Sequence, residues 1–210
     1  MKKKHNLHPK IVAHLQVSDP ILFAVFERLQ ELKDVKARHA KEFFHALCSE
    51  IISQQLSGRV ADVIFGRFED LLPHKQITPE GVLKLTHEQM RGIGMSNAKA
   101  KYIRDLAEKV VNREVDLEKL PRLSNEEVIQ ELTKIKGIGK WTAEMFLMFT
   151  LGREDIFSHG DLGLKNAIKK IYQLENPTLA EVEAISIKWS PYRTYACRIL
   201  WASLDVKEKK

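Results

Sequence analysis

Cysteine is scarce in this sequence, with two residues among 210. Cys48 and Cys197 cannot supply a disulfide framework, a four-cysteine zinc site or a four-cysteine iron–sulfur cluster on one chain. Long hydrophobic runs are also absent, because the most apolar stretch, residues 145–151, is far shorter than the roughly 20 residues that span a bilayer. Polar residues follow the basic N-terminus and interrupt any signal-peptide core. We therefore expect a protein that is neither secreted nor embedded in a membrane.

Common catalytic motifs are missing as well. The eight histidines include no His-Glu-x-x-His pair, and the chain has no Gly-x-Ser-x-Gly turn and no P-loop. The charge is modestly basic, with 34 Lys and Arg against 28 Asp and Glu, for a net charge of +6. This balance permits nucleic acid as a partner without requiring it.

Helical periodicity runs through most of the sequence. Apolar residues recur at intervals of three and four, and period-two alternation is scarce. Side chains that can cap a helix precede or begin several of these runs. Such starts occur at Asp19-Pro20, at Thr78-Pro79, at Ser124 with Glu127, and at Thr178 with Glu181. The pattern predicts an all-α fold of many short helices.

One short motif occurs twice. The letters RGIGMSNA at residues 91–98 are echoed 45 residues later by KGIGKWTA at residues 136–143. Each copy lies between two apolar helical runs and predicts a tight hairpin, in which glycine allows positive φ. The second helix of such a hairpin begins with free N–H groups that suit a phosphate, although glycine also commonly ends helices. Lys136 and Lys140 beside the second copy favour binding to a nucleic-acid backbone.

Four segments carry a resemblance to a known family. They read IISQQLS at 51–57, LTKIKGIGKWTA at 132–143, DIFSHGDLGL at 155–164 and WSPYRTYA at 189–196. Together they resemble the helix–hairpin–helix DNA glycosylases with the Gly-Pro-Asp motif (HhH-GPD), and more narrowly the 3-methyladenine DNA glycosylase II branch. The resemblance implies two helical subdomains with a DNA-binding cleft between them. We expect one subdomain at residues 40–152 and the other at 1–39 with 153–210.

Asp161 matches the catalytic aspartate of the family. Breaking an N-glycosidic bond builds positive charge on the sugar, which a fixed carboxylate stabilises, and the carboxylate can also orient or deprotonate water. An aspartate before a helix is also a common cap, and the two roles can coexist. The loop before it reads Phe157-Ser-His-Gly, where the family usually has a proline, and His159 is more typical of a solvated or phosphate-contacting side chain.

The resemblance also implies the type of reaction. Relatives that cleave the DNA backbone carry a lysine at the position of Trp141, whereas Lys140 lies one residue too early, about 100° around the helix. We therefore expect a monofunctional glycosylase that leaves an abasic site. Its substrates would be alkylated purines such as 3-methyladenine and 7-methylguanine, whose positive charge favours stacking on aromatic rings. The expected base pocket comprises Trp141, Trp201, Met145 and Leu162.

The remaining implied residues contact DNA. A flipped base leaves a gap that an inserted side chain can fill, and Gln55 matches this wedge, with Gln54 and Ser57 beside it. The matched hairpin positions are Gly137, Gly139, Lys140 and Thr142 at the phosphate, and Gly92 and Gly94 opposite the lesion. The carbonyls of Thr133, Ile135 and Ile138 match ligands of a monovalent cation, Na⁺ or K⁺, and no other cofactor is expected.

These expectations define a partner and leave alternatives. The partner is double-stranded DNA with damaged bases, and the protein would be a monomer in the cytoplasm or, in a eukaryote, the nucleus. A first alternative is a helix–hairpin–helix module that binds DNA without activity. A second is a glycosylase for mismatched, deaminated or oxidised bases. Enzymes for oxidised bases generally carry the lysine that is missing here. The adenine-mismatch type and many thymine-glycol types carry a cysteine cluster that is also missing.

Overall fold

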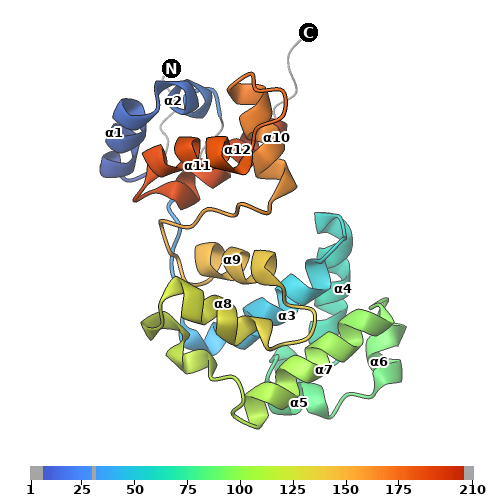
Figure 1. Cartoon of the computed structure of the whole chain (residues 1–210). Coiled ribbons are helices and arrows are strands. Elements are labelled where there is room, and N and C mark those ends of the chain that lie inside the picture. Colours follow the sequence, from blue (N-terminus) through green and yellow to red (C-terminus); the bar gives the residue numbers. More distant parts are fainter. Residues whose placement is uncertain (1–6, 30–31, 206–210) are drawn as a thin grey trace. The chain divides into compact units, whose positions relative to one another are not determined.

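The computed structural model describes residues 7–29 and 32–205, and within them the regular elements are helices (Figure 1). The all-α prediction is therefore confirmed. The described part of the chain contains no helix that is long and apolar enough to cross a membrane. The chain divides into two compact units, residues 37–151 and a second unit formed by the segments before and after them.

The unit of residues 37–151 is built around α3 and α9, with short 3-10 turns between several helices. Its helices are α3 (Phe43–Ser53), α4 (Gly58–Asp70), α5 (Pro79–Leu83), α6 (His87–Gly92), α7 (Asn97–Val111), α8 (Asn125–Thr133) and α9 (Lys140–Phe149). Phe43 and Phe146 are fully buried and meet edge to face, with ring centroids 5.5 Å apart. Because both rings are buried and in contact, a shift of α3 against α9 would disturb this packing.

The second unit joins the two ends of the chain. Its helices are α1 (Pro9–Ser18), α2 (Pro20–Phe26), α10 (Leu162–Ile171), α11 (Leu179–Ser186) and α12 (Arg193–Asp205). A buried carboxylate links them: Asp19 accepts hydrogen bonds from Leu22 N (3.0 Å), from Tyr172 Oη (2.5 Å) and from Trp189 Nε1 (2.9 Å). Burial, together with the hydrogen bond that its hydroxyl donates to Asp19, raises the pKa of Tyr172 far above its ordinary value. The phenol therefore stays a neutral donor, and Asp19 ties the start of α2 to the C-terminal helices.

The predicted helix starts are confirmed. Asp19 and Thr78 each accept a hydrogen bond from a backbone N–H three residues later. Ser124 and Thr178 form complete capping boxes with the glutamates three residues on. These interactions are local, which is why the sequence alone predicts them.

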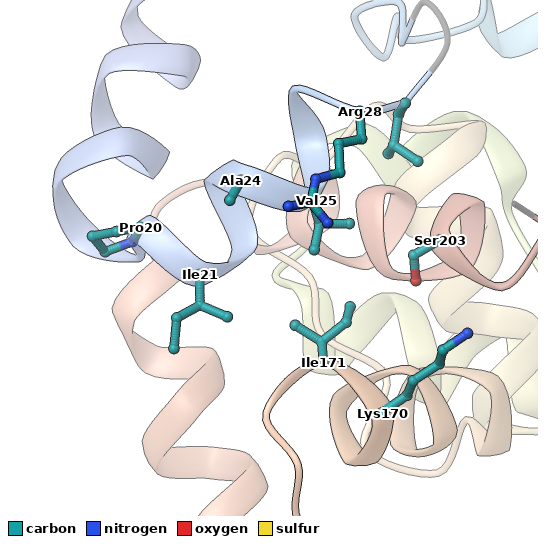
Figure 2. A pocket seen from close by; sticks show the side chains of 9 residues that line it. Pro20, Ile21, Ala24, Val25, Arg28, Lys170, Ile171 and Ser203 are labelled. Carbon is teal, nitrogen blue, oxygen red and sulfur yellow. The ribbon is translucent and has the colours of Figure 1, made fainter. Parts of the chain in front are cut away.

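The second unit also contains an apolar cavity of about 590 Å³. The side chains of Ile21 and Val25 on α2 lie around it with Ile171 at the end of α10 (Figure 2). Asp161 caps the opposite end of the same helix, which is about 15 Å long. The cavity is therefore separate from the predicted catalytic residue.

Candidate functional site

Asp161 sits at the N-cap of α10, and two donors fix its carboxylate. Its Oδ1 accepts hydrogen bonds from Leu164 N at 2.7 Å and from Trp201 Nε1 at 3.1 Å. The side chain is half-buried, as is Trp201. Aspartate before a helix commonly makes the first of these bonds, whereas the second comes from α12 and holds the carboxylate in one orientation. An oriented carboxylate of this kind can stabilise positive charge that develops beside it.

Gly163 lets this arrangement form, and sequence reasoning missed it. A Cβ there would stand 3.0 Å from Asp161 Oδ1 and 3.4 Å from Trp201 Nε1, closer than most real contacts. A Cβ there would therefore push the indole or the carboxylate by a few tenths of an ångström, and glycine avoids this displacement. A signal was available, because a glycine inside an apolar helical run costs about 1 kcal/mol relative to alanine.

The loop that leads to Asp161 is tied to the start of α12. Arg193 Nε donates to Asp155 Oδ1 at 2.7 Å, and the Oγ1 of Thr194 donates to Arg153 O at 2.6 Å. Burial alone would raise the pKa of Asp155, but hydrogen bonds from Arg193 and Ser190 outweigh it and hold that pKa below its ordinary value. The loop is thus held without the proline that the family usually carries.

His159 has a specific partner in this loop. Its Nε2 lies 2.9 Å from Glu183 Oε2 on α11, and its ring meets Phe157 edge-on at a centroid distance of 4.8 Å. These contacts place the exposed histidine beside α11. The histidine is exposed, as expected for a solvated side chain. The sequence did not predict its contact with Glu183, because the two residues lie on separate elements.

The second Gly-Ile-Gly motif forms the turn between α8 and α9, which pack side by side (Figure 1). Gly137 has φ +83°, and a Cβ there would collide with the ring of Tyr102 at 2.1 Å. Gly139 is the N-cap of α9 and has no side chain to bond the first N–H groups of the helix. Those N–H groups and the positive end of the helix dipole suit an anion such as phosphate.

The first motif makes a similar turn with a different helix start. It joins α6 to α7, with Gly94 at φ +97°, while Gly92 is the last residue of α6. Ser96 caps α7 by accepting a hydrogen bond from Lys99 N. One N–H at the start of α7 is therefore already satisfied. The two hairpins share a backbone turn, but the start of α9 has more N–H groups without a side-chain cap that could bind an anion.

The residues predicted to form the wedge lie at the end of α3. Gln54 caps this helix and its Nε2 donates to Gly137 O at 2.9 Å, with Thr142 Oγ1 at 3.4 Å. Gln55 is exposed and has φ +57°, which is unusual for a residue with a side chain. Ser57 is the N-cap of α4 without a side-chain capping bond. The structure thus brings the predicted wedge turn against the predicted phosphate-binding hairpin.

The predicted base-pocket residues fall into two groups, one in each unit. Trp141 is 45% exposed on α9, while Met145 on the same helix is buried at 5%. In the other unit Leu162 is 75% exposed and lies next to Asp161. Lys140, the first residue of α9, has its Nζ 3.9 Å from Glu144 Oε1. The described cavity of about 630 Å³ that Trp141 lines is shared with Gln54 and Gln55.

The predicted cation ligands are main-chain carbonyls in the turn that follows α8. The carbonyl of Ile135 accepts a hydrogen bond from Ile138 N at 3.1 Å, which uses one of its two lone pairs. Ile135 and Ile138 have buried side chains, so their backbones are held in place. Within residues 7–29 and 32–205, no group of three or more His, Cys, Asp or Glu side chains could hold a metal ion. A monovalent cation at these carbonyls therefore stays a prediction.

Two glycine hairpins in one unit and an aspartate-capped helix in the other define an all-helical protein of the helix–hairpin–helix class. The family model described as "HhH-GPD superfamily base excision DNA repair protein" matches residues 48–191. The chain belongs to this family. The predicted resemblance is therefore confirmed.

Named relatives narrow the comparison. The chain is 37% identical over 169 residues to DNA-3-methyladenine glycosylase 1 of Schizosaccharomyces pombe, covering 79% of this chain and 74% of that protein. The crystal structure of a DNA-3-methyladenine glycosidase from Bacillus halodurans matches 96% of this chain and 91% of its own, at 36% identity and a TM-score of 0.79. The structure of the S. pombe 3-methyladenine DNA glycosylase in complex with abasic DNA matches 91% of this chain and 95% of its own, at 32% identity and a TM-score of 0.76.

Proposed function

We propose that this protein is a DNA glycosylase that releases alkylated purines, such as 3-methyladenine and 7-methylguanine, from double-stranded DNA. The family is one of base excision DNA repair, and the relatives compared above carry 3-methyladenine glycosylase names. One of them was solved with abasic DNA, the product that this reaction leaves. The names of these relatives support the choice of substrate class.

The observation that carries the proposal is the fixed carboxylate of Asp161. Leu164 N and Trp201 Nε1 hold Oδ1, so the negative charge is already in place when the sugar becomes positive. A preorganised charge stabilises the transition state without the cost of reorienting solvent. A purine methylated at N3 or N7 is itself cationic and leaves as a neutral base, so the reaction needs no general acid. Water then attacks the sugar, and Asp161 orients it or takes its proton.

The proposed enzyme is monofunctional. Trp141 occupies the position where the lysine of the backbone-cleaving relatives stands, so no amine is available there to form a Schiff base. Lys140 precedes it on α9, about 100° around the helix, with its Nζ near Glu144. An aromatic ring such as that of Trp201, which bonds Asp161, would instead stack on the cationic base, a contact worth about 0.5–2 kcal/mol.

DNA would be held through the unit of residues 37–151. The open N-terminus of α9 and the backbone of Gly137, Gly139 and Thr142 would take a phosphate, with Lys140 adding charge, and the carbonyls of Thr133, Ile135 and Ile138 would ligate Na⁺ or K⁺ next to it. Gly92 and Gly94 in the first hairpin would grip the DNA opposite the lesion. Gln55 would fill the gap left by the flipped base.

Base release from methylated DNA tests the proposal. Plasmid treated with a simple methylating agent is incubated with the wild type and with Asp161→Asn, and the released bases are resolved by chromatography. We expect methylated purines from the wild type alone, with strand breaks that appear only after alkali. Breaks before alkali would contradict the monofunctional type. Binding without release of any methylated purine would contradict the substrate class and favour another lesion or a DNA-binding module without activity.

A further inference from the structure

Lys99 on α7 binds the backbone at the end of α3. Its Nζ donates to Ile52 O at 2.8 Å and to Gln54 O at 2.6 Å, 47 and 45 residues away in sequence. The side chain is half-buried, and this burial lowers the pKa of the lysine from its ordinary value. Carbonyls at a helix C-terminus lack partners within the helix and attract a cation. Lys99, which lies on α7, therefore satisfies carbonyls at the C-terminal end of α3.

The residues that Lys99 bonds, 52–54 at the end of α3, lead directly into Gln55. The φ of +57° at Gln55 is a conformation that residues with side chains keep only when their surroundings hold them there. Two contacts hold the preceding residue: Lys99 bonds the main-chain carbonyl of Gln54, and the side chain of Gln54 bonds the carbonyl of Gly137. The orientation of Gln55 at the protein surface therefore depends on both contacts.

The same face of α7 also holds the second hairpin. Tyr102, one turn after Lys99, packs its ring against Gly137 so closely that a Cβ there would collide with it. Asp105, three residues further, is buried and accepts a hydrogen bond from Lys136 N at 2.9 Å. Residues three apart on a helix share a face. One face of α7 thus fixes the turn that carries Gln55 and the turn that carries Gly137.

We propose that Lys99 is a positioning residue that holds the Gln54–Gln55 turn in the conformation needed to insert Gln55 into DNA. The proposal rests on the proposed function, because the insertion follows from a flipped base. Lys99 acts through Gln55 and not on the reacting atoms. Its contribution should consequently disappear when the side chain of Gln55 is removed.

A double-mutant cycle tests this dependence. Lys99→Met removes the ammonium group and keeps the apolar stem, Lys99→Arg keeps a donor, and Lys101→Met is the matched control at an exposed lysine of α7. Single-turnover release of 3-methyladenine should fall about tenfold in Lys99→Met, which corresponds to the lower end for a lost charge-assisted hydrogen bond. In a Gln55→Ala background, the same change should cost less than twofold. Lys99→Arg should recover most of the rate, and Lys101→Met should match the wild type.

Two readouts that need no catalysis separate this proposal from the proposed function. Hydrogen exchange of the free protein should become faster at residues 53–57 in Lys99→Met and not in Lys101→Met. The fluorescence of 2-aminopurine next to an abasic-site analogue should report less base unstacking in the same variant. Both changes would support the positioning role even if the wild type released no methylated base.

Other outcomes overturn the positioning role. If Lys99→Met slows 3-methyladenine release equally in the wild-type and the Gln55→Ala backgrounds, the lysine is merely structural. Unchanged exchange at residues 53–57 would show that it does not hold the turn. If Lys99→Met fails to fold, Lys99→Gln decides, because it removes the charge and shortens the donor: a folded Gln variant whose amides at residues 53–57 exchange no faster than those of the wild type contradicts the proposal.

Discussion

The two roles of Asp161, cap and catalyst, can be separated by two substitutions. Asp161→Asn keeps a side-chain oxygen that can accept from Leu164 N and Trp201 Nε1, and asparagine caps helices about as well as aspartate. We expect its free energy of unfolding to stay within about 0.5 kcal/mol of the wild type. Asp161→Ala removes the cap, which costs about 1 kcal/mol and lowers the melting temperature by roughly 2–4 °C for a chain of this size.

The rate should respond differently from the stability. Two opposite unit charges about 4 Å apart interact by about 4 kcal/mol at an effective dielectric constant of about 20. Losing that interaction with the positively charged sugar slows the reaction by about 10³-fold. Both variants remove the negative charge, so both should show this loss, although only the alanine variant should lose the cap.

Single-turnover release of 3-methyladenine, measured beside thermal melting of the same preparations, tests the reasoning. An Asp161→Asn rate within tenfold of the wild type would refute the electrostatic role. Equal melting temperatures for the asparagine and alanine variants would refute the cap. An asparagine variant that melts far below the wild type would show that the charge itself supports the fold.

Other substitutions test the packing around the site. Gly137→Ala should cost about 2 kcal/mol in unfolding free energy and weaken DNA binding, because positive φ and the Tyr102 ring exclude a Cβ; denaturant unfolding within 0.5 kcal/mol of the wild type, roughly the error of such measurements, would contradict this. Gly163→Ala should stay folded and release base several-fold more slowly, because its Cβ crowds Asp161 and Trp201. Gly66→Ala on α4, with open space around it, should keep full activity. Equal rates of base release in the two variants would contradict the crowding at position 163. The lowered pKa of Asp155 means that its contribution to stability is present above about pH 4 and is lost as the pH falls through the folded pKa. The difference in melting temperature between Asp155→Asn and the wild type should therefore shrink in acid, and a constant difference would contradict the ion pair.

The fold was largely predictable because its signals are local. Capping side chains act three residues along the chain, and helical periodicity repeats within a single turn. Sequence reasoning placed the helix starts at Ser124 and Thr178 and the turns around Gly94 and Gly137, and the structure has them there. It placed the subdomain boundaries at 40 and 152, where the structure divides the chain at 37 and 151.

The site was predicted less completely. Asp161 could be named from its place before α10 and from the resemblance, but the bond from Trp201 could not, because 40 residues separate them. Trp201 was expected as a wall of the base pocket, and that role stays a prediction. The pairing of His159 with Glu183 likewise joins a loop to a later helix. No pattern in the sequence relates the two positions.

The sequence by itself determined that this chain forms short helices, where most of them start, and that two of its turns require glycine. Those properties follow from backbone φ, from caps and from apolar spacing, all of which act within a few residues. Only the tertiary structure decided what those turns meet: the ring of Tyr102 against Gly137, and the ammonium of Lys99 at the end of α3. Such contacts arise when helices pack, since packing brings together side chains that the linear order keeps apart.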